Sequence, residues 1–302
     1  MSLLTVFTPT YNRATLLPRA YEALKRQTCK DFVWLVIDDG STDGTRELVQ
    51  NWQSDEEEFE IRYVYKENGG LYSGYTTAFQ HIDTELCVCV DSDDYLTDNA
   101  VEMMLDCWRE KGSDKYAGLI GLDAKMDGTI IGGRFPPNLK SVNLVDTMLG
   151  KAPVKDVDWK NVVRTDLYRA VLPPKELTDT FSQEKDFNPH YLHIKICEEY
   201  DFLTLNEVLC IVNYQPDGMT ATVIKQYLRS PNSFRAMRLL SLTFKKAPLK
   251  YRVKTAIHYT SSCIISKKPC ISASPQKMLT ALAYPFGLLL TAYIKLYCKN
   301  HT

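Results

Sequence analysis

Short apolar segments alternate with helical segments through residues 1–125 of the chain. The apolar segments, rich in branched and aromatic residues, are 3–8, 32–37, 61–65, 86–90 and 117–122. Apolar residues recur with helical spacing in the segments between them, at 14–27, 43–52, 71–82 and 101–110. Such alternation is typical of a mostly parallel sheet with helices on both faces. The sequence therefore predicts an α/β fold whose ligand site lies outside the carboxyl ends of the strands.

The pattern after residue 125 is looser. A strand over 157–164, a loop over 173–186, a helix from Pro189 to Tyr200 and a strand over 209–214 are the predicted elements. The helix over 43–52 is expected to begin with Ser41 or Thr42 near its N-cap, because side-chain oxygens there accept from free backbone N–H groups. We expect a mostly helical region beyond residue 218.

The sequence Asp91-Ser92-Asp93-Asp94 directly follows the apolar strand 86–90. Three carboxylates at the end of a buried strand repel one another, and a divalent cation removes that penalty. Hard oxygen ligands favour Mg²⁺ or Mn²⁺, which bind to one or two carboxylates together with substrate phosphates. The alternative is that the aspartates only favour the N-terminus of the next helix.

Polar loops also follow the first three predicted strands. They are Thr8-Pro9-Thr10-Tyr11-Asn12-Arg13, then Asp38-Asp39, then Lys66-Glu67-Asn68-Gly69-Gly70. The aromatic ring and amides of the first could hold a flat base, the carboxylates of the second could accept from a base N–H, and the glycines of the third permit close backbone approach. Each loop is also compatible with an ordinary turn, but together they predict one binding edge.

The motifs at these strand ends resemble, in order and spacing, those of family 2 glycosyltransferases with the GT-A fold. The resemblance rests on Thr8-x-x-Tyr11-Asn12-Arg13, Asp38-Asp39-Gly40-Ser41-Thr42-Asp43, Glu67-Asn68-Gly69-Gly70 and Asp91-Ser92-Asp93-Asp94. The later Glu184-Lys185, Phe187-x-Pro189, Asn206-Glu207-x-Leu209 and Tyr214-x-x-Asp217-Gly218 resemble a bacterial branch of the family. The last 80 or so residues carry no diagnostic motif.

The resemblance implies a nucleotide-sugar site along this edge. Tyr11 would lie against the base, Asp39 would accept from it, and Asp91 would contact the ribose side. Asp93 would ligate Mn²⁺ or Mg²⁺ on the diphosphate, with Asp91 as a second ligand. The full set of implied nucleotide-sugar residues is Thr8, Pro9, Tyr11, Arg13, Asp39, Lys66, Asn68, Gly69, Asp91 and Ser92.

The chain departs from the family pattern at the catalytic base. Aligning on Phe187-x-Pro189 places His190 where the family has a carboxylate. A neutral imidazole is a competent base near pH 7, and Asp186 and Glu184 are the nearby carboxylates. All three remain candidates. The family's alanine–x–asparagine pattern is also missing from 71–79, so the resemblance leaves the sugar open.

Charge is distributed very unevenly along the chain. Residues 218–302 contain fourteen Lys and Arg and no Asp or Glu, whereas the first 217 residues contain 22 basic and 37 acidic residues. Residues 278–294 carry no charge and lie between Lys277 and Lys295. This length is at the lower edge of a membrane span, and Pro285 and Gly287 interrupt it. A segment lying in an anionic membrane interface is favoured over a buried core helix.

We therefore expect two regions. Residues 1–217 would form the GT-A domain, with a nucleotide-binding part (1–125) and an acceptor part (126–217), and 218–302 a basic helical region. The expected function is a metal-dependent, inverting glycosyltransferase using a nucleotide sugar, with a UDP-sugar favoured, and a glycan or lipid-linked acceptor. The alternatives are an inactive nucleotide-sugar-binding or scaffold relative and, ranked lower because 8–13 lack glycine, a nucleotidyltransferase.

The location follows from the same features. The N-terminal residues have no basic stretch before an apolar one, so they favour a first strand over a signal peptide. The nine cysteines include no C-x-x-C pair, which favours reduced thiols. A cytoplasmic protein, peripheral on the inner face of the cell membrane, is expected. A nucleic-acid partner is not expected, because the apolar segment 278–294 would serve no purpose in nucleic-acid binding.

Overall fold

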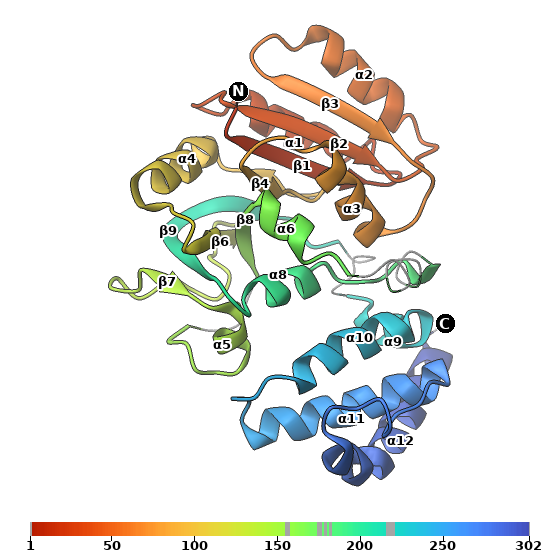
Figure 1. Cartoon of the computed structure of the whole chain (residues 1–302). Helices are drawn as coiled ribbons and strands as arrows, with labels where there is room; N and C mark the ends of the chain where they lie inside the picture. Colours follow the sequence, from red (N-terminus) through yellow and green to blue (C-terminus); the bar gives the residue numbers. More distant parts are fainter. Residues whose placement is uncertain are drawn as a thin grey trace. The chain divides into compact units, whose positions relative to one another are not determined.

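A computed structural model describes residues 2–154, 158–173, 177, 180, 183–215 and 221–301. The chain divides into two compact units (Figure 1). The first, here the sheet unit, comprises Met1–Gly69, Gly74–Leu172 and Leu192–Tyr214. The second, here the helical unit, comprises Gly70–Ser73, Pro173–Tyr191 and Gln215–Thr302. The boundary expected at residue 217 lies outside the described residues.

The sheet unit contains a mixed nine-stranded sheet. Its strands run in the order β3-β2-β1-β4-β8-β6-β9-β5, and β7 pairs with β9. Strands β1 to β4 are parallel to one another, and β8, which is antiparallel to both β4 and β6, joins them to β6. The strands are β1 Leu4–Thr10, β2 Phe32–Asp38, β3 Glu60–Tyr65, β4 Leu86–Cys89, β5 Tyr95–Leu96, β6 Tyr116–Lys125, β7 Ser141–Val142, β8 Trp159–Arg164 and β9 Asp201–Val212.

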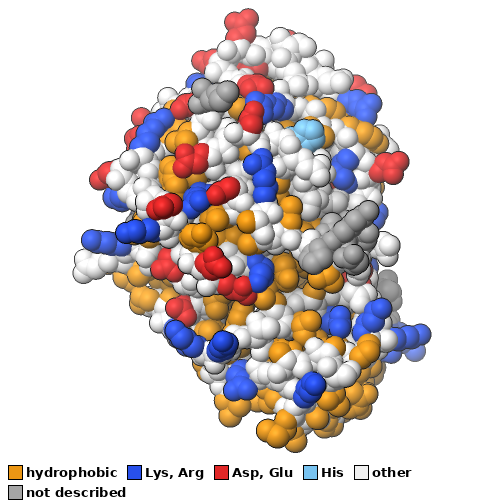
Figure 2. Space-filling model, viewed as in Figure 1, with side chains coloured by type: hydrophobic (Ala, Val, Ile, Leu, Met, Phe, Trp, Pro, Cys, Tyr) orange, Lys and Arg blue, Asp and Glu red, His pale blue; other side chains and the backbone are white. Residues whose placement is uncertain are grey.

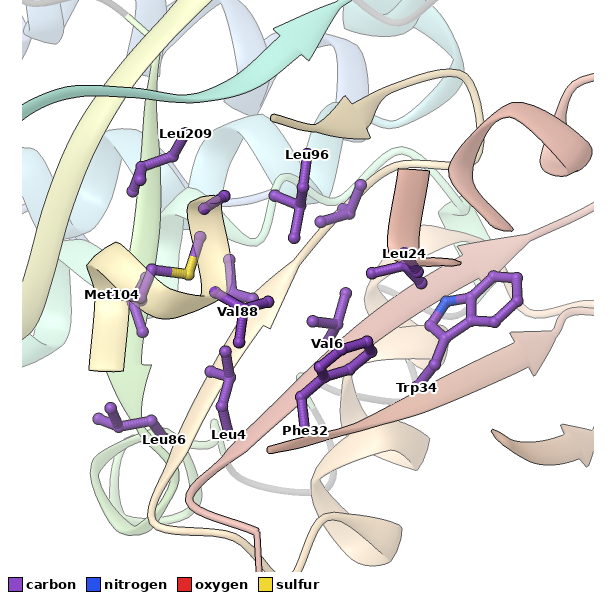
Figure 3. Packing of buried hydrophobic residues seen from close by; sticks show 14 of the residues in the cluster. Leu4, Val6, Leu24, Phe32, Trp34, Leu86, Val88, Leu96, Met104 and Leu209 are labelled. Carbon is purple, nitrogen blue, oxygen red and sulfur yellow. The ribbon is translucent and has the colours of Figure 1, made fainter. Parts of the chain in front are cut away.

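Helices cover both faces of this sheet. On one face Leu4, Val6, Phe32, Trp34 and Val88 form a buried cluster with residues of α1, α2 and α4 (Figure 3). On the other, Phe7 of β1 makes edge contacts with Tyr75 and Phe79 of α3, and Phe79 stacks on Tyr168 of α6. The helices are α1 Leu17–Lys25, α2 Thr45–Asp55, α3 Leu71–His81, α4 Ala100–Lys111, α5 Leu144–Met148, α6 Thr165–Ala170 and α8 His190–Ile196. The predicted α/β fold is thus confirmed.

The helical unit contains α9 Val223–Arg229, α10 Pro231–Leu242, α11 Leu249–Ser266 and α12 Lys277–Asn300. Helix α11 contacts both α10 and α12. A small core joins the three helices and includes Leu242, Ala256, Tyr259, Cys263 and Ala283. The mostly helical region predicted after residue 218 is therefore present.

Two local predictions are wrong. Helix α2 begins at Thr45, and its N-cap is Gly44 rather than Ser41 or Thr42. The reason is that Ser41 and Thr42 bond to Asn12 of the neighbouring loop instead. Strand β9 begins at Asp201, eight residues before the predicted strand, because its alternation is broken by Thr204, Asn206 and Glu207.

Candidate functional site

The loops after β1 and β2 are bound to each other by side chains. Asn12, in a left-handed conformation with φ of 51°, donates its backbone N–H to Ser41 Oγ at 2.9 Å. Its Oδ1 accepts from the backbone N–H of Thr42 at 2.8 Å. The backbone N–H of Ala14 donates to Asp43 Oδ2 at 3.0 Å. These bonds fix the loop that carries Tyr11, whose side chain is 49% exposed.

The two aspartates at the end of β2 extend this connection to β3. Asp38 is fully buried and accepts from Tyr63 Oη at 2.6 Å and from the backbone N–H of Ser41 at 2.7 Å. Asp39 Oδ1 accepts from the backbone N–H of Gly69 at 2.9 Å and from Lys66 Nζ at 2.5 Å. The structure therefore brings Asp39, Lys66 and Gly69 together as the sequence predicted.

Asn68 and Gly40 close the contact between these loops. Asn68 Nδ2 donates to the backbone carbonyl of Asp39 at 2.9 Å. Gly40 has a φ of 87°, and a Cβ there would lie 2.9 Å from the backbone nitrogen of Asn68. A larger residue would suffer both backbone strain and a clash, so glycine is required at this crossing.

The predicted residues at the end of β1 are more deeply buried. Thr8 is fully buried, and its Oγ1 accepts from Trp34 Nε1 at 3.0 Å. Pro9 packs against Gly74, where a Cβ would lie 3.2 Å from Pro9 Cβ. The side chain of Thr8 thus supports the sheet interior. Arg13 is half-buried, and its carbonyl accepts from Leu16 and Leu17 at the start of α1.

The acidic loop follows β4, the strand beside β1. Asp91 is exposed and Asp93 half-buried, whereas Ser92 and Asp94 are buried. The Asp94 carboxylate accepts from the backbone N–H of Asn213, just after β9, at 3.0 Å. Burial raises the pKa of Asp94 to about 7; Lys160 opposes this rise and Asp91 adds to it. Asp94 therefore anchors the loop, while Asp91 and Asp93 are accessible.

The accessible carboxylates fit a divalent cation only in part. Among the described residues, no group of three or more His, Cys, Asp or Glu is placed to hold an ion. Two carboxylates supply hard oxygen ligands, and further oxygens would have to come from a bound diphosphate and water. This donor set fits a cation that binds together with its substrate.

Buried charges next to this loop were missed in the sequence. Lys160 of β8 lies opposite Gly121 of β6 in the sheet, and Asp123 lies further along β6. Both side chains are more than nine-tenths buried. Burial raises the pKa of Asp123 to about 6, which Lys160 opposes and Asp158 and Asp91 increase. The available signal was a lysine and an aspartate inside otherwise apolar strands, which are rarely buried without a partner.

We expect Lys160→Met to destabilise the protein in a pH-dependent way. Because the folded pKa of Asp123, about 6, exceeds its ordinary 3.8, its ionisation lowers the folding stability as pH rises from about 4 to about 6. The positive charge of Lys160 offsets that cost only at pH values at which the carboxylates of Asp123 and Asp94 are ionised. The loss of unfolding free energy should be about 2–4 kcal/mol at pH 8 and under about 1 kcal/mol at pH 5.

Urea unfolding at the two pH values measures this difference. The matched control is Lys125→Met, which removes an exposed lysine at the end of β6 and should change stability by less than about 0.5 kcal/mol at both. An equal loss for Lys160→Met at pH 5 and pH 8 would show that packing rather than charge is affected.

The three candidate bases lie in the helical unit, where the carboxylates of Glu184 and Asp186 are both hydrogen-bonded. Glu184 Oε1 accepts from the backbone N–H and Nδ2 of Asn232 at 2.9 and 2.8 Å, and Oε2 from the backbone N–H and Oγ of Ser233, both at 2.7 Å. Asp186, 7% exposed, pairs through both oxygens with Arg229 at 2.5 Å and accepts from Ser230 Oγ at 2.7 Å.

His190 is the first residue of α8. It is half-buried, and its backbone N–H donates to Asn188 Oδ1 at 2.8 Å. His193 is buried, and its Nε2 lies 2.6 Å from Tyr168 Oη. His193 is therefore a core residue.

The sequence of the sheet unit matches a known family. Residues 5–145 match the family model described as "Glycosyl transferase family 2". Residues 5–145 are a family 2 glycosyltransferase domain. They contain all of the strand-end loops described above, so the resemblance read from the motifs is confirmed.

Curated relatives match over the same part of the chain. A GalNAc(5)-diNAcBac-PP-undecaprenol β-1,3-glucosyltransferase of Campylobacter jejuni is 31% identical over 123 residues, 40% of this chain and 38% of the relative. A validoxylamine A glucosyltransferase of Streptomyces hygroscopicus is 49% identical over 70 residues, 22% of this chain and 16% of the relative. The chain thus spans less than two fifths of the length of these relatives.

Solved structures share the fold across nearly the whole chain. S. aureus TarS (residues 1–349) has a TM-score of 0.57 at 16% identity, covering 100% of this chain and 92% of that one. A Pyrobaculum calidifontis mannosyltransferase, solved with GDP-Man and Mn²⁺, has a TM-score of 0.52 at 17% identity and covers 98% and 88%. At these identities the likeness establishes the GT-A fold.

Proposed function

We propose that the chain is a metal-dependent, inverting glycosyltransferase that moves a sugar from a nucleotide sugar to an acceptor hydroxyl. The observation that carries this proposal is the position of Asp91 and Asp93. They follow β4, next to β1, on the edge where side chains bind the loops of β1, β2 and β3 together. In parallel α/β sheets that edge is where nucleotides bind.

The nucleotide would be held by the loops of β1 to β3. The exposed ring of Tyr11 can stack on a base, an interaction worth about 1–3 kcal/mol per base. The Asp39 carboxylate, oriented by Lys66 and Gly69, can accept from a base N–H. A UDP-sugar is the favoured donor, since TarS was solved with UDP and with UDP-GlcNAc.

Asp93, with Asp91 beside it, would hold Mn²⁺ or Mg²⁺ together with the diphosphate oxygens. Such a cation would neutralise the negative charge that develops on the departing nucleoside diphosphate. The fit of two accessible carboxylates to such a shared ion supports this assignment, as does the Mn²⁺ bound in the mannosyltransferase structure.

We propose His190 as the base. Every hydrogen-bonding position of the Glu184 carboxylate is occupied at the start of α10, and both oxygens of Asp186 are paired with Arg229. His190 would take the proton of the acceptor hydroxyl while the oxygen of that hydroxyl attacks C1 of the sugar. The bond from C1 to the diphosphate oxygen breaks, and the anomeric configuration inverts.

The acceptor would be a glycan or a lipid-linked saccharide. The C. jejuni relative is named for an undecaprenol-linked acceptor, which supports the lipid-linked class. Such acceptors are presented at a membrane, so we place the protein in the cytoplasm, at the inner face of the cell membrane.

A donor-hydrolysis screen tests the function. The full chain is mixed with UDP-, GDP-, dTDP- and CMP-sugars in the presence of Mn²⁺, Mg²⁺ or EDTA, and release of the nucleoside diphosphate, or of CMP, is followed. We expect release from one donor class that EDTA abolishes. Calorimetry with the same nucleotide sugars measures binding with and without the metal ion. Absence of both turnover and metal-dependent nucleotide binding would favour the scaffold alternative.

A further inference from the structure

Helix α12 exposes a continuous row of large apolar side chains. These residues are spaced three or four apart and so share one face, here the outer face; they are Met278 (79% exposed), Leu282 (67%), Phe286 (57%), Leu289 (69%), Tyr293 (57%) and Leu296 (61%). A surface helix of a protein in water normally places polar residues on its exposed face. The outer face is too long and regular to be scattered surface residues.

The opposite face of α12 is small and partly polar. Its buried residues are Thr280, Ala283, Gly287, Thr291 and Ile294. Thr291 Oγ1 lies 2.9 Å from Ser261 Oγ of α11, and a Cβ on Gly287 would lie 2.5 Å from Thr260 Cγ2. Close packing through small and hydroxyl residues is typical of helix pairs in membranes. Helix α12 thus turns its large apolar side chains outward and its small, partly polar ones inward, the reverse of a helix that packs in water.

The charges around the outer face all have one sign. Lys277, Lys295 and Lys299 are exposed and lie along one flank of α12, because separations of 18 and 22 residues are close to whole numbers of turns. The wider region, 218–302, has fourteen basic residues and no acidic one. Figure 2 shows hydrophobic and basic side chains, and no acidic ones, over the helices of this region on the face in view.

We propose that the outer face of α12 lies in the interface of an anionic membrane. The large side chains would enter the acyl boundary while the three lysines contact lipid phosphates. Helix α12 is also the one helix among the described residues long and apolar enough to cross a bilayer. A crossing helix, however, would carry Lys277 and Lys299 to opposite surfaces, whereas an in-plane helix places all three lysines at one plane of headgroups.

A second copy of the chain is a less suitable occupant. An antiparallel symmetric pairing of two outer faces would bring together two rows of lysines with no acidic residue in 218–302 to compensate them. Like charges juxtaposed in an interface oppose association. The charge around the outer face therefore favours lipid phosphates over self-association.

Vesicle flotation of the full chain tests this proposal. We expect flotation with phosphatidylcholine vesicles containing 30% phosphatidylglycerol, weaker flotation with phosphatidylcholine alone, and loss of that difference at 1 M NaCl. The triple variant Met278→Ser/Leu282→Ser/Leu289→Ser should lower the partition coefficient by about tenfold or more. The variant Lys277→Gln/Lys295→Gln/Lys299→Gln should lower it about tenfold on the anionic vesicles only.

The matched control is Met126→Ser, which removes an exposed methionine (55% exposed) of the sheet unit and should float as the parent does. Thermal unfolding checks that every variant is folded. Equal flotation of the parent and the triple serine variant would overturn the proposal. So would a parent that stays unbound but forms a dimer that the triple variant lacks.

This inference names the surface that would hold the protein at the membrane of the proposed function, and it does not depend on the transferase chemistry. The vesicle assay contains neither donor nor metal, so failure of the donor screen leaves flotation unchanged. Conversely, an active enzyme that does not bind vesicles would retain the proposed chemistry and lose only this surface.

Discussion

Asp93→Ala is expected to reduce metal-dependent donor turnover by about 10²–10³-fold, with little change in folding stability. The carboxylate would be a ligand of the cation that neutralises the leaving diphosphate, and stabilisation of this kind is a large part of the transition-state energy. Asp93 is half-buried at the rim of the acidic loop, whereas the buried anchor of that loop is Asp94. The measurement is nucleotide release from the preferred donor with saturating Mn²⁺ or Mg²⁺, together with thermal unfolding.

The control for this variant is Asp106→Ala. Asp106 is an exposed aspartate of α4 whose side chain is 68% accessible and pairs with Arg109, and its removal should leave the rate unchanged. A second readout is the metal concentration needed for half-maximal rate, which should rise in Asp93→Asn. An Asp93→Ala enzyme with the parent rate and the parent metal dependence would remove Asp93 from the metal site.

Glu184→Ala is expected to destabilise the helical unit by about 2–4 kcal/mol. The Glu184 carboxylate accepts four hydrogen bonds at the start of α10, two of them from backbone N–H groups of Asn232 and Ser233. Those N–H groups belong to the first turn of a helix and have no partner within it, and bonds to a charged acceptor are among the stronger ones. Urea unfolding measures the loss.

Substitutions of Glu184 and His190 distinguish a structural role from a catalytic one. Glu184→Gln, assayed well below its unfolding temperature, should keep kcat within about tenfold of the parent. His190→Gln should lower kcat by about 10²–10⁴-fold at nearly unchanged stability, as expected for loss of a general base. Glu198→Ala, which breaks an exposed pair with Lys195, is the stability control at under about 0.5 kcal/mol. A Glu184→Gln enzyme that is fully stable yet inactive would make Glu184 the base.

Much of the sheet unit could be predicted because its signals are local. Each of the first four strands is an apolar run that ends in a polar loop, so both the fold and the binding edge follow from periodicity. Asp39, Lys66 and Gly69 are brought together as expected, because neighbouring parallel strands end at the same edge. The roles of the individual residues toward a nucleotide stay predictions.

The features that could not be predicted depend on pairing between distant segments. Lys160 and Asp123 lie 37 residues apart in the sequence, and their charges interact only because β8 inserts between β4 and β6. Glu184 bonds to residues 48 and 49 positions later, so its role as a helix cap is invisible in the local sequence. The true start of α2 was missed for the same reason, since Asn12 binds the residues expected to cap that helix.

The bonds among the loops of β1, β2 and β3 bear on how the proposed nucleotide would be recognised. Asn12, Asp38 and Asp39 hold these loops in place with side-chain bonds that need no ligand. In the proposed function, a nucleotide bound there would meet loops that are already ordered, and it would lose little affinity to ordering the chain. Selectivity among bases should therefore be stringent, because a base of the wrong shape meets loops that are already held by one another and cannot easily rearrange around it.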